Sequence, residues 1–185
     1  YKVLSNNTSG CNNVGFGFWA LNGNTTGNHN FAQGWCVLCG NTTGSGNFAQ
    51  GYKALPVNTT GCGNIAIGCF TLFCNNGASN NIALGFGALR YNTTGANNTA
   101  FGRAALYSNT SGGNNSAFGT YALFANTTGV NNTAMGRQAL SGNTSGVGNT
   151  AIGSLSLLNN TTGNYNSSFG LNALRNNVVG SRNNA

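Results

Sequence analysis

The sequence predicts an all-β protein built as a single β-solenoid (β-roll) of about eleven coils stacked along one axis. Three observations predict this class. One pattern returns every 17 residues without an insertion, Gly and Asn hold fixed places in it, and each unit is too short for a helix pair. Units that bury their apolar side only against a neighbouring unit are typical of solenoids.

The repeat is clearest in a leucine column that runs in steps of 17 from Leu4 to Leu174. When positions 1 to 17 are counted from Asn7, the unit reads N-T-[TS]-G-x-x-N-x-A-x-G-x-x-A-L-x-x. We therefore expect one repeat domain over residues 1–185. It comprises a partial coil at 1–6, ten full coils over 7–176 and a second partial coil at 177–185.

Positions 7 to 11, as in residues 98–102, alternate in the manner of a short strand. From this alternation we expect the large side chains at position 10, such as Phe101 and Phe118, to form the core face. Ala and Leu at positions 14 and 15 predict a second apolar contact. Positions 1 to 4 predict a turn in which Asn bonds its own backbone and Gly takes a positive φ. Gly at position 11 indicates a positive φ or a close backbone approach.

Stacked coils lie roughly 4.8 Å apart, so identical side chains form ladders along the axis. Amides can hydrogen-bond from coil to coil, whereas an Asp ladder would set like charges against each other. We predict ladders of three residue types. The Asn ladder includes Asn13, Asn30, Asn47, Asn64, Asn98, Asn115 and Asn132. The Leu ladder includes Leu21, Leu38, Leu55, Leu72, Leu89, Leu106, Leu123 and Leu140. The Gly ladder includes Gly102, Gly119 and Gly136.

Composition limits the possible functions. Asp and Glu are absent, 4% of residues are charged, and the net charge is +7. No side-chain carboxylate can serve as a general acid or base, in an EF-hand or in a Ser-His-Asp triad. His29, the single His, occupies an expected turn position. We expect no enzyme activity, no cofactor and no metal site. The basic residues are too sparse for a nucleic-acid groove, and no apolar run approaches the roughly 18 residues of a membrane span.

Two groups of residues remain as candidate sites. An aromatic stripe at positions 12 and 13 predicts either a lateral packing interface or a glycan-binding surface. It contains Phe18, Trp19, Trp35, Tyr52, Phe70 and Phe86. The six Cys all lie in the first four coils, and pairing within a coil or between subunits is geometrically easiest. The residues considered for disulfides are Cys36, Cys39, Cys69 and Cys74, with buried free thiols as the alternative.

The runs at residues 98–102 and 64–68, the first of them followed three residues later by Ala105, resemble the head repeats of trimeric autotransporter adhesins. Similar repeats with Asn-Thr-Thr-Gly spacers occur in phage and giant-virus tail-fibre-like proteins. The resemblance implies a parallel β-roll, a trimeric assembly and a place at a cell or virion surface. The 17-residue coil is longer than the adhesin unit.

These observations favour a structural filament subunit, extracellular or on a virion. The residues of the two partial coils together nearly complete one coil, so we expect subunits to join head to tail into a homopolymer. The expected joint comprises Tyr1, Lys2, Val3, Leu4, Asn177, Val178, Val179, Asn183 and Ala185. Lateral or trimeric contacts are a further expectation. The alternatives are an adhesin or receptor-binding fibre segment and, as a minor possibility, an ice-binding protein suggested by the Thr at positions 2 and 3.

Overall fold

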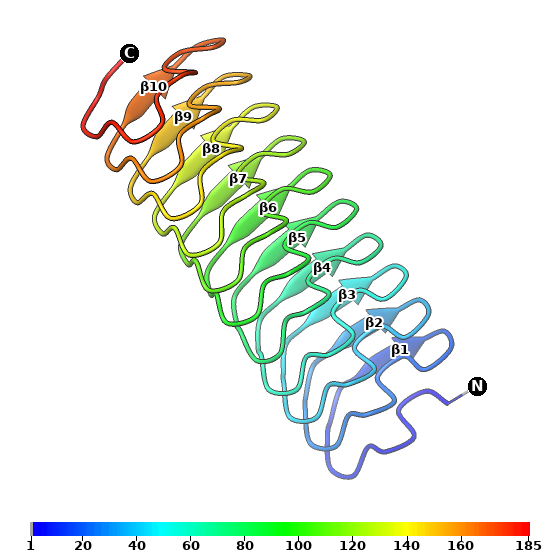
Figure 1. Cartoon of the computed structure of the whole chain (residues 1–185). Helices are drawn as coiled ribbons and strands as arrows, with labels where there is room; N and C mark the ends of the chain where they lie inside the picture. Colours follow the sequence, from blue (N-terminus) through cyan, green and yellow to red (C-terminus); the bar gives the residue numbers. More distant parts are fainter. Residues whose placement is uncertain (1) are drawn as a thin grey trace.

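A computed structural model describes residues 2–185, and in them ten parallel strands of three residues each form one sheet. The strands are β1 (Val14–Phe16), β2 (Phe31–Gln33), β3 (Phe48–Gln50), β4 (Ile65–Ile67), β5 (Ile82–Leu84), β6 (Thr99–Phe101), β7 (Ser116–Phe118), β8 (Thr133–Met135), β9 (Thr150–Ile152) and β10 (Ser167–Phe169). They follow one another in chain order along a rod (Figure 1). The predicted all-β solenoid is confirmed.

Nine turns separate β1 from β10, slightly fewer than the expected coil count of about eleven. The difference arises at the ends of the rod. Residues 177–185 contribute only one isolated bridge, between Ser167 and Asn184, and residues 2–6 contribute no strand. The two ends of the chain lie at opposite ends of the rod (Figure 1).

Each strand pairs with the strand 17 residues further along, so identical repeat positions face each other. Ala32 lies opposite Ala49, and Ala100 lies opposite Ala117. A slip of one residue would turn every side chain of a strand to the other face. The unbroken 17-residue spacing is therefore what keeps the ten strands in register.

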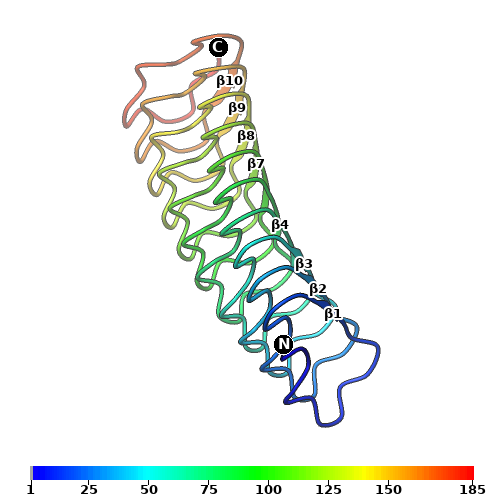
Figure 2. The ribbon, with the colours of Figure 1, turned by 90° about the vertical axis from the view of Figure 1, so that its right-hand side faces the viewer.

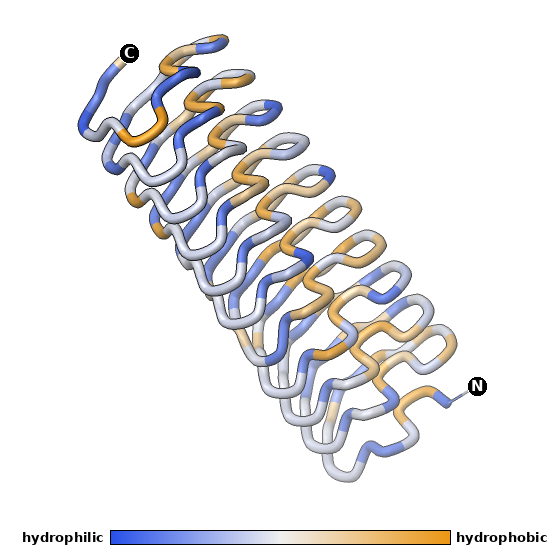
Figure 3. The backbone as a smooth tube through the Cα atoms, in the orientation of Figure 1, coloured by the Kyte–Doolittle hydropathy of each residue, from blue (hydrophilic) through white to orange (hydrophobic). Residues whose placement is uncertain are grey.

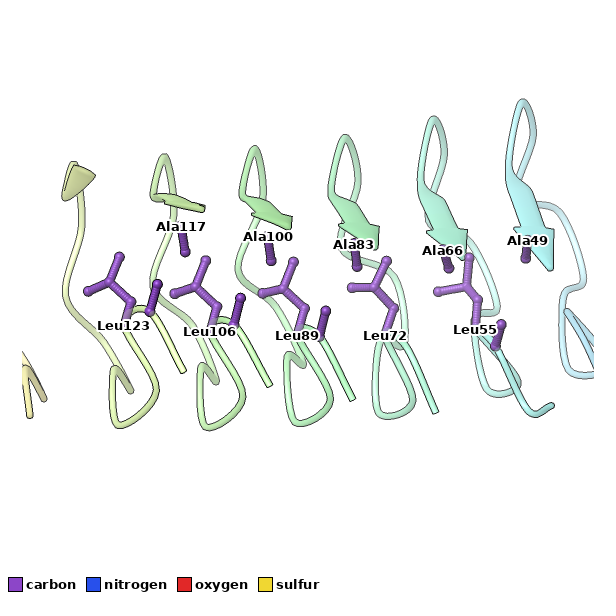
Figure 4. Close-up of a cluster of buried hydrophobic side chains, with 14 of the residues drawn as sticks. Ala49, Leu55, Ala66, Leu72, Ala83, Leu89, Ala100, Leu106, Ala117 and Leu123 are labelled. Carbon is purple, nitrogen blue, oxygen red and sulfur yellow. The ribbon is translucent and has the colours of Figure 1, made fainter. Parts of the chain in front are cut away.

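The interior consists of Ala from the strands and Ala-Leu pairs from the opposite wall of each coil. Ala100, Ala105 and Leu106 are representative, and all three are fully buried. Figure 4 shows the strand Ala side chains in one row and the Leu side chains in a second row that points toward it. The apolar contact expected at positions 14 and 15 is confirmed.

The expectation that position 10 forms the core face is wrong. Position 9 points inward, and positions 8 and 10 point outward, so Phe118 is 38% exposed and Met135 is 44% exposed. The coil interior is narrow, because the strand Ala already contacts the Leu row across it. Alternation identifies a strand but does not say which of its faces lies inside.

The predicted Asn ladders are confirmed in two rows. In the first row, at position 1, Asn109 Nδ2 donates to Asn92 Oδ1 at 2.7 Å and to the Gly112 carbonyl at 2.9 Å. In the second row, at position 7, Asn98 Nδ2 donates to Asn81 Oδ1 at 3.2 Å and to Gly112 O at 2.8 Å. Both rows therefore meet on the carbonyl of the position 4 glycine. Their amides are buried but hydrogen-bonded, which removes the cost of burying a polar group.

The glycines at positions 11 and 4 of the repeat have different structural roles. Gly102, at position 11, has a φ of +133°, and a Cβ there would lie 2.7 Å from the Gly119 carbonyl group. Gly112, at position 4, lacks the positive φ that we expected. A Cβ on Gly112 would instead lie 2.4 Å from the carbonyl oxygen of Gly129. The turn needs this glycine for close approach of the next coil, and the Asn-to-backbone bond expected in the same turn is present.

The leucine ladder lies in the left-handed region of backbone conformation. Leu106 and Leu123 have φ values of 51° and 50°, and both side chains are fully buried. A non-glycine residue in this region costs roughly 1–2 kcal/mol, whereas burial of a Leu side chain contributes roughly 1.5–3 kcal/mol. Burial therefore offsets the strain in every coil. The resulting sharp turn brings the chain back toward the next Asn-Thr turn.

Figure 2 shows the strands aligned along one side of the rod. In Figure 3, hydrophobic residues are concentrated along one side of the coils, and the opposite turns are pale or blue. The rod therefore has chemically different sides that run its whole length.

Candidate functional site: an aromatic and cationic surface

The loop that follows each strand sends positions 12 and 13 outward and positions 14 and 15 inward. In the second coil, Trp35 is 37% exposed, whereas Val37 and Leu38 are fully buried. Residues at position 13, such as Trp19 and Phe70, have a φ near +60°. This turn places the aromatic stripe of the sequence on the outer surface of the rod.

The structure brings the six stripe residues together in one continuous row. Trp35 and Tyr52 stack with ring centroids 5.1 Å apart, and Phe70 meets Tyr52 edge-on at 5.3 Å. Phe86 continues the row at 6.0 Å from Phe70. At the other end, Phe18 contacts both Trp19 and Trp35. Such pairs add roughly 0.5–1.5 kcal/mol each beyond the area that they bury.

Four further aromatic residues outside the predicted stripe lie beside this row. These are Phe73, Tyr91, Tyr107 and Phe124, at positions 16 and 17. Phe73 contacts Phe70 at 5.7 Å, and Tyr107 stacks on Phe124 at 5.2 Å. The signal was present in the sequence, because Tyr107 and Phe124 share position 16. The sequence did not show that the chain turns at the buried Ala-Leu pair of positions 14 and 15. This turn places position 16 beside position 13.

Cationic groups lie over these rings. Lys53 Nζ is 5.1 Å from the Trp35 ring centroid, and the Arg90 guanidinium is 4.8 Å from the Phe70 ring. The Arg90 guanidinium also lies within 6 Å of the rings of Phe73, Tyr91 and Tyr107. Its Nε is buried and has no hydrogen-bond partner within the described residues. Arg90 is therefore held mainly by aromatic faces, which stabilise a cation more strongly where water is excluded.

Two ionisable groups next to Arg90 have raised pKa values. Burial raises the pKa of the Tyr107 hydroxyl, and a hydrogen bond with Tyr91 raises it further. Burial also raises the pKa of the Cys74 thiol, although the positive charge of Arg90 partly offsets this effect. In both cases desolvation disfavours the charged form.

A pocket of about 230 Å³ opens within this surface, across the loops that follow β5, β6 and β7. Its lining residues are Phe86, Arg103, Ala104, Tyr107, Tyr121 and Phe124. The Arg103 guanidinium lies 5.6 Å from the Tyr121 ring centroid, and Arg103 is exposed. The pocket therefore combines apolar walls with one accessible cation.

The cysteines considered for disulfides differ in state. Cys36 and Cys39 form a disulfide within one loop, whereas Cys69 and Cys74 are both free thiols. In residues 2–185, no three His or Cys side chains are grouped as metal ligands would be. The same part of the chain has no helix of the length and apolarity needed to cross a bilayer.

In the Asn-Thr-Thr turns at positions 1 to 3, the Asn is buried and the second Thr is exposed. Asn24 and Asn109 are fully buried in the position 1 ladder. The hydroxyl of Thr25 donates to the Thr42 carbonyl at 3.0 Å, whereas Thr26, next to it, is exposed. The two Thr positions thus do not form one flat face of free hydroxyls.

The residues of the expected subunit joint divide between the two ends of the rod. Tyr1 lies outside the described residues. Lys2 is exposed and Val3 is partly exposed, while Leu4 packs partly against the core at the first coil. At the other end, Asn177 and Asn183 extend the two Asn ladders by one rung. Val178, Val179 and Ala185 are exposed there.

No family model, no curated protein and no solved structure matches this chain.

Proposed function

We propose that this protein is a structural, non-enzymatic subunit of a filament, extracellular or on the surface of a virion. One observation carries the proposal. The outward side of the ten-stranded sheet, formed by positions 8 and 10 and here called the sheet face, carries at least one large apolar side chain in every strand. Gln33 and Gln50 at position 10 and the Thr or Ser at position 8 of β6 to β10 are its polar members. Phe16 and Phe169, near its two ends, are each 59% exposed, and Met135 between them is 44% exposed.

An uncovered face of this kind needs a partner. Parallel sheets are normally covered on both faces, and large exposed apolar patches mark interaction surfaces. A second copy of the chain is the occupant that fits best, because its side chains repeat with the same spacing of about 4.8 Å per coil. Two such faces can interdigitate along their full length, as the sheets of β-sandwiches and steric zippers do. Lateral pairing of rods would thus cover the exposed residues of position 10.

Head-to-tail joining of rods is the second part of the proposal. At the first coil, Asn7 Nδ2 donates to the Gly10 carbonyl at 2.9 Å, and in the next rung Asn24 Nδ2 donates to Asn7 Oδ1 at 2.8 Å. At the opposite end, Asn177 Oδ1 accepts a long hydrogen bond from Asn183 Nδ2 at 3.5 Å, and it is the acceptor that a further Asn at position 1 would use. The first coil of one rod and the last coil of another therefore have complementary hydrogen-bonding groups. Exposed strand edges favour this type of pairing.

The lateral contact can be tested by introducing charge on the sheet face. The variant Phe118→Lys/Met135→Lys should remain folded but sediment as single rods, because each Lys would be desolvated in the contact. The control variant Thr128→Lys/Ser145→Lys adds the same charge on the exposed Thr-Gly turns and should assemble as the parent chain does. Sedimentation velocity and negative-stain microscopy distinguish these outcomes. A parent chain that stays monomeric at all concentrations, or a face variant that assembles normally, would refute lateral pairing.

The end-to-end contact has a separate test. Deletion of residues 177–185 should leave the coils of β1 to β10 folded, since each coil contacts mainly its neighbours. The truncated rods should no longer form long filaments when examined by microscopy. Filaments of normal length would show that the joint is wrong.

The aromatic surface and its pocket favour a second candidate function, that of an adhesin or receptor-binding fibre segment. Exposed rings and a pocket are not required for a rod that only bears load. A glycan array tests this function directly, and Trp19→Ala/Trp35→Ala should weaken attachment if the whole row takes part. An array without any bound glycan would remove this candidate while leaving the filament proposal intact.

A further inference from the structure

We propose that the pocket between the loops after β5, β6 and β7 binds one negatively charged sugar ring of a linear acidic glycan. The anionic group of that ring is a carboxylate or a sulfate. This inference rests on the adhesin candidate above and names its ligand class, and it does not depend on filament assembly.

The pocket exists because the aromatic row is interrupted at position 13. Phe70 and Tyr121 occupy this position in the fourth and seventh coils, but Gly87 and Ala104 occupy it in the two coils between. Ala104 is 5% exposed and lines the pocket. A Cβ on Gly87 would lie 3.3 Å from the Tyr107 ring, so this ring packs closely over the glycine. Two missing side chains leave a gap roughly two coils long, about 10 Å.

The walls of the gap are aromatic and rigid. Tyr107 and Phe124 stack at an interplanar angle of 12°, and Tyr121 meets Phe124 edge-on at 5.4 Å. Phe86 is 48% exposed on the opposite side. The C–H face of a pyranose ring is apolar and gains from burial against such surfaces. Because the rings already contact one another, little side-chain entropy is lost when a ligand enters.

Arg103 determines the charge of the ligand. Its guanidinium is accessible, and no Asp or Glu exists in the chain to neutralise it. Arg90 differs, because its guanidinium is enclosed by four rings. A guanidinium can hold a carboxylate or a sulfate through two parallel hydrogen bonds. An anionic sugar is therefore favoured over a neutral one at this pocket.

The size of the pocket suits one ring of a longer chain. Pockets that enclose a drug-sized molecule have roughly 300–1,000 Å³, and this pocket has about 230 Å³. The remainder of a linear glycan can lie along the rod, where Trp35 and Tyr52 continue the row of rings beside Lys53. A nucleic acid is a poorer match, since each phosphate contact needs its own cation and the pocket offers only Arg103.

The test measures binding of four probes by isothermal titration calorimetry. The probes are a hyaluronate hexasaccharide with carboxylates, a heparin hexasaccharide with sulfates, neutral chitohexaose, and a single-stranded DNA hexamer. The chain should bind at least one of the two acidic glycans in preference to chitohexaose and DNA. The acidic probe that binds more tightly identifies the anionic group.

Three variants locate the site. Arg103→Gln should weaken binding of the acidic glycan at least about tenfold, because it removes the charge-assisted hydrogen bonds to the anionic group. Ala104→Phe should abolish binding by filling the gap. It suits the backbone, because Phe70 and Tyr121 have similar positive φ values at the same position. The control is Arg137→Gln. Arg137 occupies the same repeat position as Arg103 but lies in the loop after β8, one coil beyond the pocket, so this variant should bind as the parent does.

The outcomes are exclusive. Equal binding by Arg103→Gln and Arg137→Gln, or undiminished binding by a folded Ala104→Phe, would overturn the pocket assignment. Preference for chitohexaose or for DNA would overturn the ligand class. A glycan array that shows binders lost on Trp19→Ala/Trp35→Ala but retained in Ala104→Phe would preserve the adhesin candidate and reject this pocket. Circular dichroism checks that each variant is folded.

Discussion

Asn98 Oδ1 accepts two hydrogen bonds from Asn115, one from its backbone N–H at 3.0 Å and one from its Nδ2 at 3.2 Å. One amide oxygen thus joins two coils through both backbone and side chain. The same arrangement recurs between Asn115 and Asn132. The Asn side chains of the ladder therefore take part in the backbone hydrogen bonding that joins one coil to the next.

Replacement of Asn98 by Leu should lower the free energy of unfolding by at least about 3 kcal/mol. The substitution leaves the buried backbone N–H of Asn115 without its acceptor, which costs roughly 1–3 kcal/mol. It also removes the Asn98 side-chain bonds to Asn81, Gly112 and Asn115 Nδ2, which contribute roughly 0.5–1.5 kcal/mol each. Urea unfolding followed by circular dichroism measures the change. The adjacent Asn97 is exposed with a φ of 59°, so Asn97→Gly should change stability by no more than about 0.5 kcal/mol. Equal effects of the two substitutions would show that the ladder does not stabilise the rod.

Leu106→Ala should cost roughly 2–5 kcal/mol, because a fully buried side chain leaves a cavity in a stack that cannot close locally. The matched control is Leu171→Ala, since Leu171 is 70% exposed. Its effect should stay within about 0.5 kcal/mol. A loss below about 0.5 kcal/mol for Leu106→Ala would contradict the position of the Leu row inside the coil.

Gly102→Val should disrupt stacking around β6 and β7. The φ of +133° belongs to a region that is almost confined to glycine, and a side chain there would collide with the Gly119 backbone. We expect a loss of more than about 3 kcal/mol or failure to fold, measured by thermal denaturation. The control Gly113→Ser places a residue that other coils already carry at position 5, as at Ser45 and Ser79. A Gly102→Val protein as stable as the control would disprove the close approach.

The Cys74 thiol should react with iodoacetamide more slowly than an unperturbed thiol at the same pH. Its raised pKa lowers the fraction of thiolate, which is the reactive form, so the midpoint of the rate profile should move to higher pH. Arg90→Gln should move this midpoint higher still, because the positive charge of Arg90 stabilises the thiolate. The other five Cys are replaced by Ser so that mass spectrometry follows one site. A midpoint at the ordinary thiol value, or a downward shift in Arg90→Gln, would contradict the burial of this thiol beside Arg90.

The raised pKa of Cys74 also affects how the stability of the fold depends on pH. A thiol whose pKa is raised on folding retains its proton in the folded chain to a higher pH than in the unfolded chain. Stability should therefore fall as the pH rises from the ordinary thiol pKa toward the raised value of Cys74. Below the ordinary thiol pKa both states are protonated, and this group has no effect on the pH dependence.

Much of the candidate site was predictable from the sequence, since the six stripe residues occupy two positions of the repeat. The pocket was not predictable. It depends on Tyr107 and Phe124, at position 16, returning beside Ala104 at position 13, and this return follows from the turn at the buried Leu106. Repeat positions taken one at a time do not show which of them become neighbours around the coil.

The solenoid, its 17-residue coil, the strand positions and the Asn ladders follow from the amino-acid sequence, because identical residues at a constant interval stack in register. Which face of each strand lies inside depends on packing across the coil. Alternation at positions 8 to 10 allows either face to be buried, and we expected Phe118 to be the inner residue. The decision comes from the space across the coil, where Leu106 already reaches the strand and leaves room for Ala117 alone. That constraint turns Phe118 outward and creates the sheet face on which the proposed assembly depends.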